Sequence, residues 1–222
     1  MAGIIGKKVG MTNIFNREGH VVPVTVIEAG PCVVLGTKTN EKDGYFSVLL
    51  GFGDIKMSKV KKPQLKMFEK LNIPPKKVIK EIRTLNPSSY NIGDKVDVKI
   101  FKIGDYVDVS GVSIGKGFQG GIKRWHWRGG ESGHGSMFHR APGSIGASSF
   151  PSRVFKGHHL PGHMGNVKRT IQNLEVMAVD EEKNLLIVKG GVPGHKSGIL
   201  IVRNAKKIPA TATIEQKNED KK

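Results

Sequence analysis

Cysteine, acidic residues and long apolar runs are scarce in this sequence. The single cysteine, Cys32, cannot form a disulfide within the chain, which favours a reducing compartment. It lies in the apolar run 32–35, so we expect a buried thiol. No run of about 18 apolar residues occurs, and no membrane-spanning helix is predicted. Near the N-terminus only Ile4 and Ile5 are large and apolar before Lys7, too few for a signal-peptide core, and we expect a cytoplasmic protein.

The shortage of acidic residues leaves a large positive charge. The chain has 36 Lys and Arg against 19 Asp and Glu, a formal net charge of +17. Such a charge predicts a polyanionic partner, because Lys and Arg that neutralise phosphates release condensed counterions. Residues 55–83, the basic insertion, hold ten basic and two acidic side chains, and residues 111–165, the extension, hold seven and one. Residues 1–54 and 84–110 are nearly balanced, so two cationic surfaces are attached to an ordinary globular body.

The balanced parts predict a mainly β body. Their β-branched and aromatic residues favour short strands. Strands are expected at 21–28, 32–39, 45–50, 96–100, 106–109, 174–179, 185–189 and 199–202. Asp43-Gly44 and Gly104-Asp105 are turn signals, since glycine tolerates the positive φ of tight turns. Short strands joined by tight turns favour a closed or sandwiched β structure.

Helix signals are few, and the clearest lies in the basic insertion. Pro63 suits a first helical turn, and Leu65, Phe68 and Leu71 then fall on one face. Pro74-Pro75 would end this helix. Its outer face would be rich in lysine, which fits either an RNA-binding surface or a merely solvated face.

The extension differs in kind from the body. It contains fourteen glycines, six of the eight histidines, both tryptophans and no sustained apolar periodicity. Basic side chains mixed with aromatics and glycines suit insertion into folded RNA, where cations meet phosphates and planar groups stack on bases. We expect a body of residues 1–110 and 166–210, an extension over 111–165 that becomes ordered on RNA, and a flexible tail over 211–222.

Two glycine motifs in the extension resemble nucleotide-binding motifs, but each lacks a feature that such a site requires. Residues 115–120 match G-x-G-x-x-G, but a dinucleotide site needs a helix next, and 122–130 do not look like one. Residues 111–116 resemble a phosphate-binding loop, yet they are one spacer short and lack the following Ser or Thr.

The histidines raise a metal or nuclease hypothesis. Metal and nuclease sites usually add carboxylates or thiolates, and this region offers one acid, Glu131, and no cysteine. Histidines facing RNA or solvent are the favoured interpretation, and no enzyme is predicted. The histidines concerned are His126, His134, His139, His158, His159 and His163.

Several motifs, taken in order, resemble a known family. They are GIIGKKVGMTNIF at 3–15, GKGFQG at 115–120, KRW at 123–125, HRAPGSIG at 139–146, VFKG at 154–157, HMGN at 163–166 and NLLIVKG at 184–190. Together they resemble the large-subunit ribosomal protein L-three family in its bacterial form, over nearly the whole chain.

The resemblance implies a closed β-barrel of the translation-protein type with a long irregular extension and one or two short helices. It implies a structural constituent of the large ribosomal subunit in the cytoplasm, which binds large-subunit rRNA early in assembly and touches neighbouring ribosomal proteins. It implies no membrane, no small-molecule substrate and no cofactor beyond structural Mg²⁺ held by the RNA.

The resemblance also assigns residues. It places Trp125 in a tryptophan-bearing finger, and it brings one loop closest to the peptidyl transferase centre: Gly143, Ser144, Ile145, Gly146, Ala147, Ser148 and Ser149. Some bacterial members carry a methylated glutamine at the position of Ser149, so that modification should be absent here. The residues that we expect to bind rRNA are Lys7, Lys8, Lys59, Lys61, Lys62, Lys116, Lys123, Arg124, Trp125, His126, Arg128, His139, Arg140, Arg153, Lys156, Lys168 and Arg169.

Two alternatives stay open at this point. A free-standing RNA chaperone or translation factor could use the same barrel, and its extension would then be dispensable for assembly of ribosomal particles. A histidine-dependent nuclease would instead lose its activity when the metal or the histidines are removed.

Overall fold

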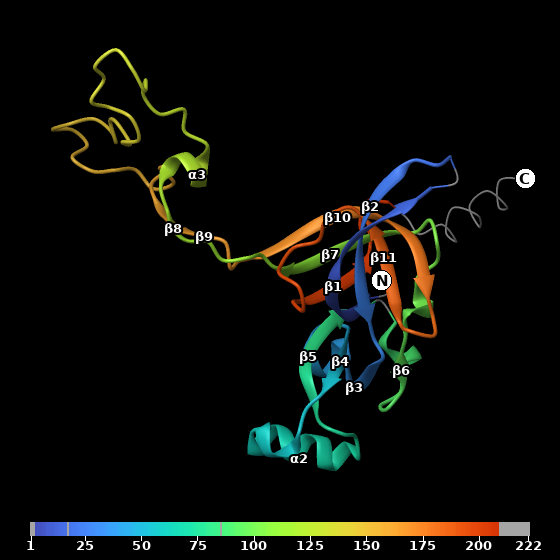
Figure 1. Ribbon diagram of the computed structural model, residues 1–222. Coiled ribbons are helices and arrows are strands. Elements are labelled where there is room, and N and C mark those ends of the chain that lie inside the picture. The colour runs from blue at the N-terminus through green and yellow to red at the C-terminus, as the bar shows by residue number, and fades with distance from the viewer. Residues whose placement is uncertain (1–2, 17, 85, 209–222) are drawn as a thin grey trace, which may run out of the picture. The chain divides into compact units, whose positions relative to one another are not determined.

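The computed structural model describes residues 3–16, 18–84 and 86–208 and divides the chain into two units (Figure 1). One unit comprises the chain up to Val112 and from Lys168 onward, and the other is Ser113–Val167. Both borders lie two residues later in the sequence than expected, because the pairing of β7 with β10 runs through Val112 on one strand and begins at Lys168 on the other. The flexible tail that we expected at 211–222 lies outside the described residues.

The first unit contains a closed six-stranded antiparallel barrel, which confirms the predicted fold class. Around the barrel the strands follow the order β1 (Gly3–Phe15), β12 (Ile199–Asn204), β7 (Tyr106–Val112), β10 (Lys168–Asp180), β11 (Leu185–Lys189) and β2 (Val21–Ala29). Alternate residues of β7, such as Val107 and Val109, are fully buried, as the period of two in a strand requires. The barrel interior is therefore filled by side chains.

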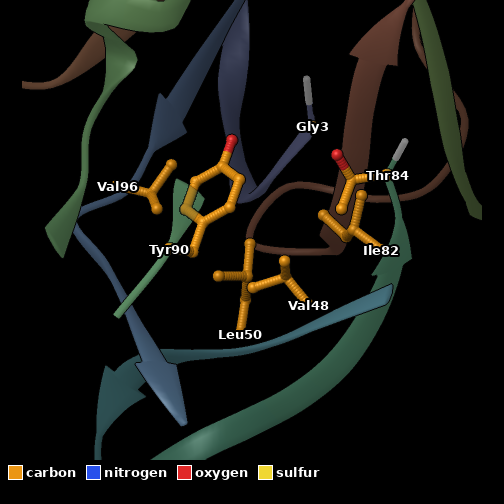
Figure 2. A pocket seen from close by; sticks show the side chains of 7 residues that line it. All are labelled: Gly3, Val48, Leu50, Ile82, Thr84, Tyr90 and Val96. Atoms are coloured by element: carbon orange, nitrogen blue, oxygen red, sulfur yellow. The ribbon is translucent and has the colours of Figure 1, made fainter. Parts of the chain in front are cut away.

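A four-stranded sheet shares the core of the barrel. Its order is β5 (Lys76–Arg83), β4 (Ser47–Asp54), β3 (Cys32–Lys38) and β6 (Lys95–Val96). Ile4 and Ile5 of β1 belong to the same buried cluster as Leu50 of β4. Figure 2 shows Leu50 and Tyr90 among the side chains around a cavity beside Gly3, and the cavity measures only about 10 Å³. A space that holds at most one water molecule is a packing defect and cannot serve as a ligand site.

The helices are short: α1 (Asn40–Asp43), α2 (Lys62–Leu71) and α3 (Gly121–Trp125), with 3₁₀ turns at Met57–Lys59, Pro87–Ser89 and Val98–Ile100. The predicted helix of the basic insertion is confirmed as α2, with Phe68 buried. It ends at Leu71 because Asn72 adopts the left-handed conformation (φ 53°), before Pro74 is reached. In Figure 1, α2 lies beyond the ends of β4 and β5, which it connects. Among the described residues, no helix has the length and apolar character needed to span a membrane.

Two local predictions in the body differ from the structure in detail. The strand expected at 96–100 pairs only at Lys95–Val96, after which Val98 and Phe101 are buried three residues apart. That spacing matches a 3₁₀ turn, which the N–H of Phe101 closes by donating to the carbonyl of Val98. The hairpin expected around Asp43-Gly44 is present, since β3 pairs with β4 and Gly44 has positive φ (76°), but its connection contains α1 and is longer than a tight turn.

The second unit, the extension as the structure bounds it, has little regular structure. A two-stranded pair joins β8 (Gly117–Gln119) to β9 (Gly162–Met164), and α3 follows β8. The expectation that no helix follows the motif at 115–120 was wrong. However, α3 has five residues and the strand lies inside the motif, so the strand–loop–helix order of a dinucleotide site is missing.

Candidate nucleic-acid interface

The extension holds seven Lys and Arg side chains, and in Ser113–Val167 none of them forms an ion pair with the single acid there, Glu131. All are exposed except Arg124, which is half-buried. They are Lys116, Lys123, Arg124, Arg128, Arg140, Arg153 and Lys156. Their charges therefore face solvent without internal compensation, which suits phosphate binding.

A small cluster of contacts joins residues 124–125 of the extension to residues 159–160. The guanidinium of Arg124 and the indole N–H of Trp125 both donate to the carbonyl of Leu160, at 2.7 and 2.9 Å. The indole of Trp125 also stacks on the imidazole of His159, with ring centroids 4.1 Å apart and planes 6° from parallel. These contacts join segments that lie 35 residues apart in the sequence, so the extension has a defined local geometry.

Trp127 is fixed by a close approach to the backbone. It is half-buried, and a Cβ on Gly121 would collide with its six-membered ring. Only glycine at this position lets the indole lie against α3. The helix ends at Trp125, and the next residue, His126, is exposed and left-handed (φ 61°).

Large apolar side chains of the extension are exposed among these cations. Phe118 is 77% exposed, Phe150 89% and Met137 100%. The rings of Phe118 and Phe150 are therefore accessible to unpaired bases, on which aromatic side chains can stack. Residues 143–149 are exposed throughout and contain no charged side chain.

The histidines do not assemble into a metal centre. Within the described ranges, no group of three or more His, Cys, Asp or Glu side chains could hold a metal ion. His159 is occupied by its stack on Trp125, and Nδ1 of His139 lies 2.7 Å from the carbonyl oxygen of Glu131. Each of these two therefore has a structural contact of its own.

Two of the predicted RNA-binding lysines in the body are engaged internally. Lys8 donates to the carbonyls of Val192 and Gly194, both at 3.1 Å, and Lys7 lies 3.5 Å from the carboxylate of Glu28. Both lysines are half-buried. Lys8 in particular is positioned to tie the β1 strand to the loop before β12, and it is less available to a phosphate than the lysines of the extension.

Lys38, another lysine of the body, has its charge compensated by an acidic partner. Lys38 donates to the hydroxyl of Tyr45 at 2.9 Å and pairs with Glu81 at 3.0 Å, while that hydroxyl donates to Glu81 at 2.8 Å. Hydrogen bonds to Tyr45 and Glu81 raise the pKa of Lys38, and hydrogen bonds from Tyr45 and Lys38 lower the pKa of Glu81. The positive charge of Lys38 is therefore neutralised by Glu81 and is less available to a phosphate.

The remaining predicted cations are free to meet a partner. Lys59, Lys61 and Lys62 are exposed at the start of α2, and Lys168 and Arg169 are exposed at the start of β10. None of these five forms an ion pair in the part of the chain that the structure describes.

Sequence reasoning missed one feature of the extension, a hollow of about 360 Å³. No spacing in the sequence indicates it, because it forms where three separated segments meet. Its lining consists of Trp127, Pro142, Ser144, Gly157, His158 and His159.

Comparison with known proteins identifies the family. A family model described as "Ribosomal protein L3" matches residues 81–184. The chain is 53% identical to the large ribosomal subunit protein uL3 of Carboxydothermus hydrogenoformans over 205 residues, which cover 92% of this chain and 98% of that protein. It is 49% identical to the large ribosomal subunit protein uL3 of Brachyspira pilosicoli over 207 residues, with coverages of 93% and 95%. The resemblance seen in the sequence motifs is thereby confirmed, and the chain belongs to the ribosomal protein L3 family.

Proposed function

We propose that this chain, a structural protein of the large ribosomal subunit, binds large-subunit rRNA directly through its extension and through the lysines around α2. The observation that carries the proposal is the set of uncompensated cations in the extension, mixed with exposed aromatic rings and opposed by one acid. Cations of this kind neutralise phosphates, while exposed rings stack on unpaired bases. Family membership makes the chain a structural protein rather than an enzyme, so the nuclease hypothesis is not retained.

The finer parts of the proposal rest on the family resemblance. We infer that binding occurs early in assembly, in the cytoplasm, and that neighbouring ribosomal proteins are further partners. Structural Mg²⁺ would be held by the RNA. The loop 143–149 is proposed to reach toward the peptidyl transferase centre and to support it by packing. Its small uncharged residues offer no primed acid, base or nucleophile.

Salt dependence tests RNA binding. The probe is transcribed large-subunit rRNA of Carboxydothermus hydrogenoformans, the source of a relative 53% identical to this chain. If about 6–10 phosphates are contacted, affinity should fall roughly a thousandfold or more between about 50 and 200 mM salt, by analogy with duplex DNA. An affinity that does not change with salt would contradict the proposal. Co-sedimentation with large subunits through moderate salt separates a ribosomal protein from a free-standing factor.

A charge placed in the loop tests its proximity to the peptidyl transferase centre. Gly143 is left-handed (φ 71°), a conformation that Asp and Asn both tolerate better than most residues. Gly143→Asp should repel nearby phosphates and alter sensitivity to drugs that act at the peptidyl transferase centre, whereas the neutral Gly143→Asn should do much less. Drug inhibition of translation by ribosomes carrying each variant is the measurement. Equal drug responses of Asp, Asn and wild-type particles would place the loop elsewhere.

A further inference from the structure

We propose that the hollow lined by Trp127, Pro142, Ser144, Gly157, His158 and His159 binds one nucleobase that is extruded from its RNA strand. The proposal rests on the proposed RNA binding and adds to it a defined receptor for a single base. A volume of about 360 Å³ lies within the roughly 300–1,000 Å³ typical of small-molecule sites, so a flat base with its sugar fits.

The lining has the chemistry that an unstacked base requires. Trp127 contributes an indole and His158 and His159 contribute imidazoles, and such planar rings replace the stacking that a base loses on extrusion. The hydroxyl of Ser144 supplies a donor and acceptor for the polar edge of a base. Aromatic faces beside a polar group suit a base better than a phosphate or an aliphatic chain.

Two walls of the hollow, Trp127 and His159, are held in place before any ligand arrives. Trp127 is fixed against Gly121, where no side chain could be accommodated. His159 is fixed by its parallel stack on Trp125, which itself donates to the carbonyl of Leu160. A receptor whose walls are already ordered loses little conformational entropy when it binds.

Charge complementarity identifies the occupant as part of a nucleic acid. Two lining residues have exposed cations as chain neighbours, Arg128 after Trp127 and Lys156 before Gly157. Neither cation forms an ion pair within the extension, whose only acid is Glu131. A base in the hollow would therefore be attached to a phosphate chain that these cations attract.

The test compares RNA with and without bases. Full-length protein is titrated, at one fixed salt concentration, with a decamer of adenylate and with a decamer of abasic ribose phosphate. Both carry the same backbone charge, so the ratio of the two dissociation constants isolates the contribution of the bases. Stacking of one base predicts that wild type prefers the adenylate decamer by roughly five- to 150-fold.

Variants locate this preference. Trp127→Ala should lose at least fivefold of it, whereas Phe15→Ala, which removes a 76% exposed ring of the body on β1, should lose less than twofold. Ser144→Phe places a large side chain in the hollow and leaves Trp127, His158 and His159 unchanged. This variant should also abolish the preference for the adenylate decamer, and its thermal unfolding should match that of wild type. It therefore tests the hollow independently if Trp127→Ala fails to fold.

The outcomes separate the two proposals. If wild type binds neither decamer, the proposed RNA binding and the hollow both fail. If it binds both decamers equally, RNA binding stands and the base receptor is overturned. The base receptor is also overturned if Ser144→Phe keeps the preference, or if Phe15→Ala loses as much of it as Trp127→Ala.

Discussion

Gly121 has the indole of Trp127 directly over its α-carbon, and this contact predicts a specific sensitivity. Gly121→Ala should displace the indole, because the added methyl would occupy the space of its six-membered ring. Gly120→Ala is the matched control, since a Cβ there meets nothing within 4 Å. Near-ultraviolet circular dichroism and tryptophan fluorescence report the change selectively, because both tryptophans lie in the extension. Identical spectra for the two variants would show that the indole is not held by α3.

Cys32 confirms the expectation of a buried thiol, and its environment predicts low reactivity. Burial raises its pKa from 9.0 to about 12, and the thiol donates a hydrogen bond to the carbonyl of Ile5 at 3.4 Å. At pH 8 the reactive thiolate is then about one part in ten thousand. Alkylation of native protein by iodoacetamide should therefore be far slower than alkylation in denaturant. Rapid labelling of the native chain, followed by mass spectrometry, would contradict this placement.

The start of α2 presents a lysine cluster whose contribution can be isolated. Replacing Lys59, Lys61 and Lys62 by Gln should lower rRNA affinity and reduce the slope of log affinity against log salt by about 2–3, because each phosphate contact contributes roughly 0.7–0.9. The control replaces Lys99 and Lys189, which already pair with Glu181 and Glu175. An unchanged slope in the triple variant would identify the cluster as a solvated face.

Elements were predictable where the side-chain pattern was local and unambiguous. Residues 185–189 and the helix at Lys62–Leu71 follow from apolar spacing alone. The strand β1, Gly3–Phe15, was not expected, because its glycines and lysines lack strand propensity. It exists through its partners, since it pairs with both β2 and β12 to close the barrel. Long-range pairing of this kind leaves no periodic signal in the strand itself.

The candidate site was predictable in composition but not in geometry. Charge counting identified the extension, and six of its seven Lys and Arg side chains are exposed. Nothing in the sequence indicated that Trp125 and His159 stack, because their contact joins distant segments. Lys8 was predicted to bind rRNA, and nothing in the sequence indicated that it also donates to carbonyls of the body. Charge alone cannot distinguish a lysine that meets RNA from one that meets its own backbone.

At the scale of the whole molecule, the barrel is complete without the extension. Every residue of the buried hydrophobic cluster described in the structure comes from the first unit. The strands that flank the extension, β7 and β10, pair directly, with Val112 opposite Lys168 and Gly111 opposite Arg169. The extension therefore begins and ends at adjacent positions, where a tight turn could connect the two strands.

This geometry predicts that the body folds by itself. Replacing residues 113–167 by a four-residue Gly/Ser linker should leave a cooperatively unfolding β protein, because no core side chain is removed. The melting temperature should be equal to that of the full chain or higher, since each halving of a loop lowers its closure cost by about 0.6 kcal/mol. Circular dichroism during heating measures this.

The same variant should lose most rRNA affinity, because the seven Lys and Arg side chains of the extension are gone. If the thermal transition disappears, the extension is part of the folding unit; if affinity persists, the lysines around α2 are the principal RNA contact.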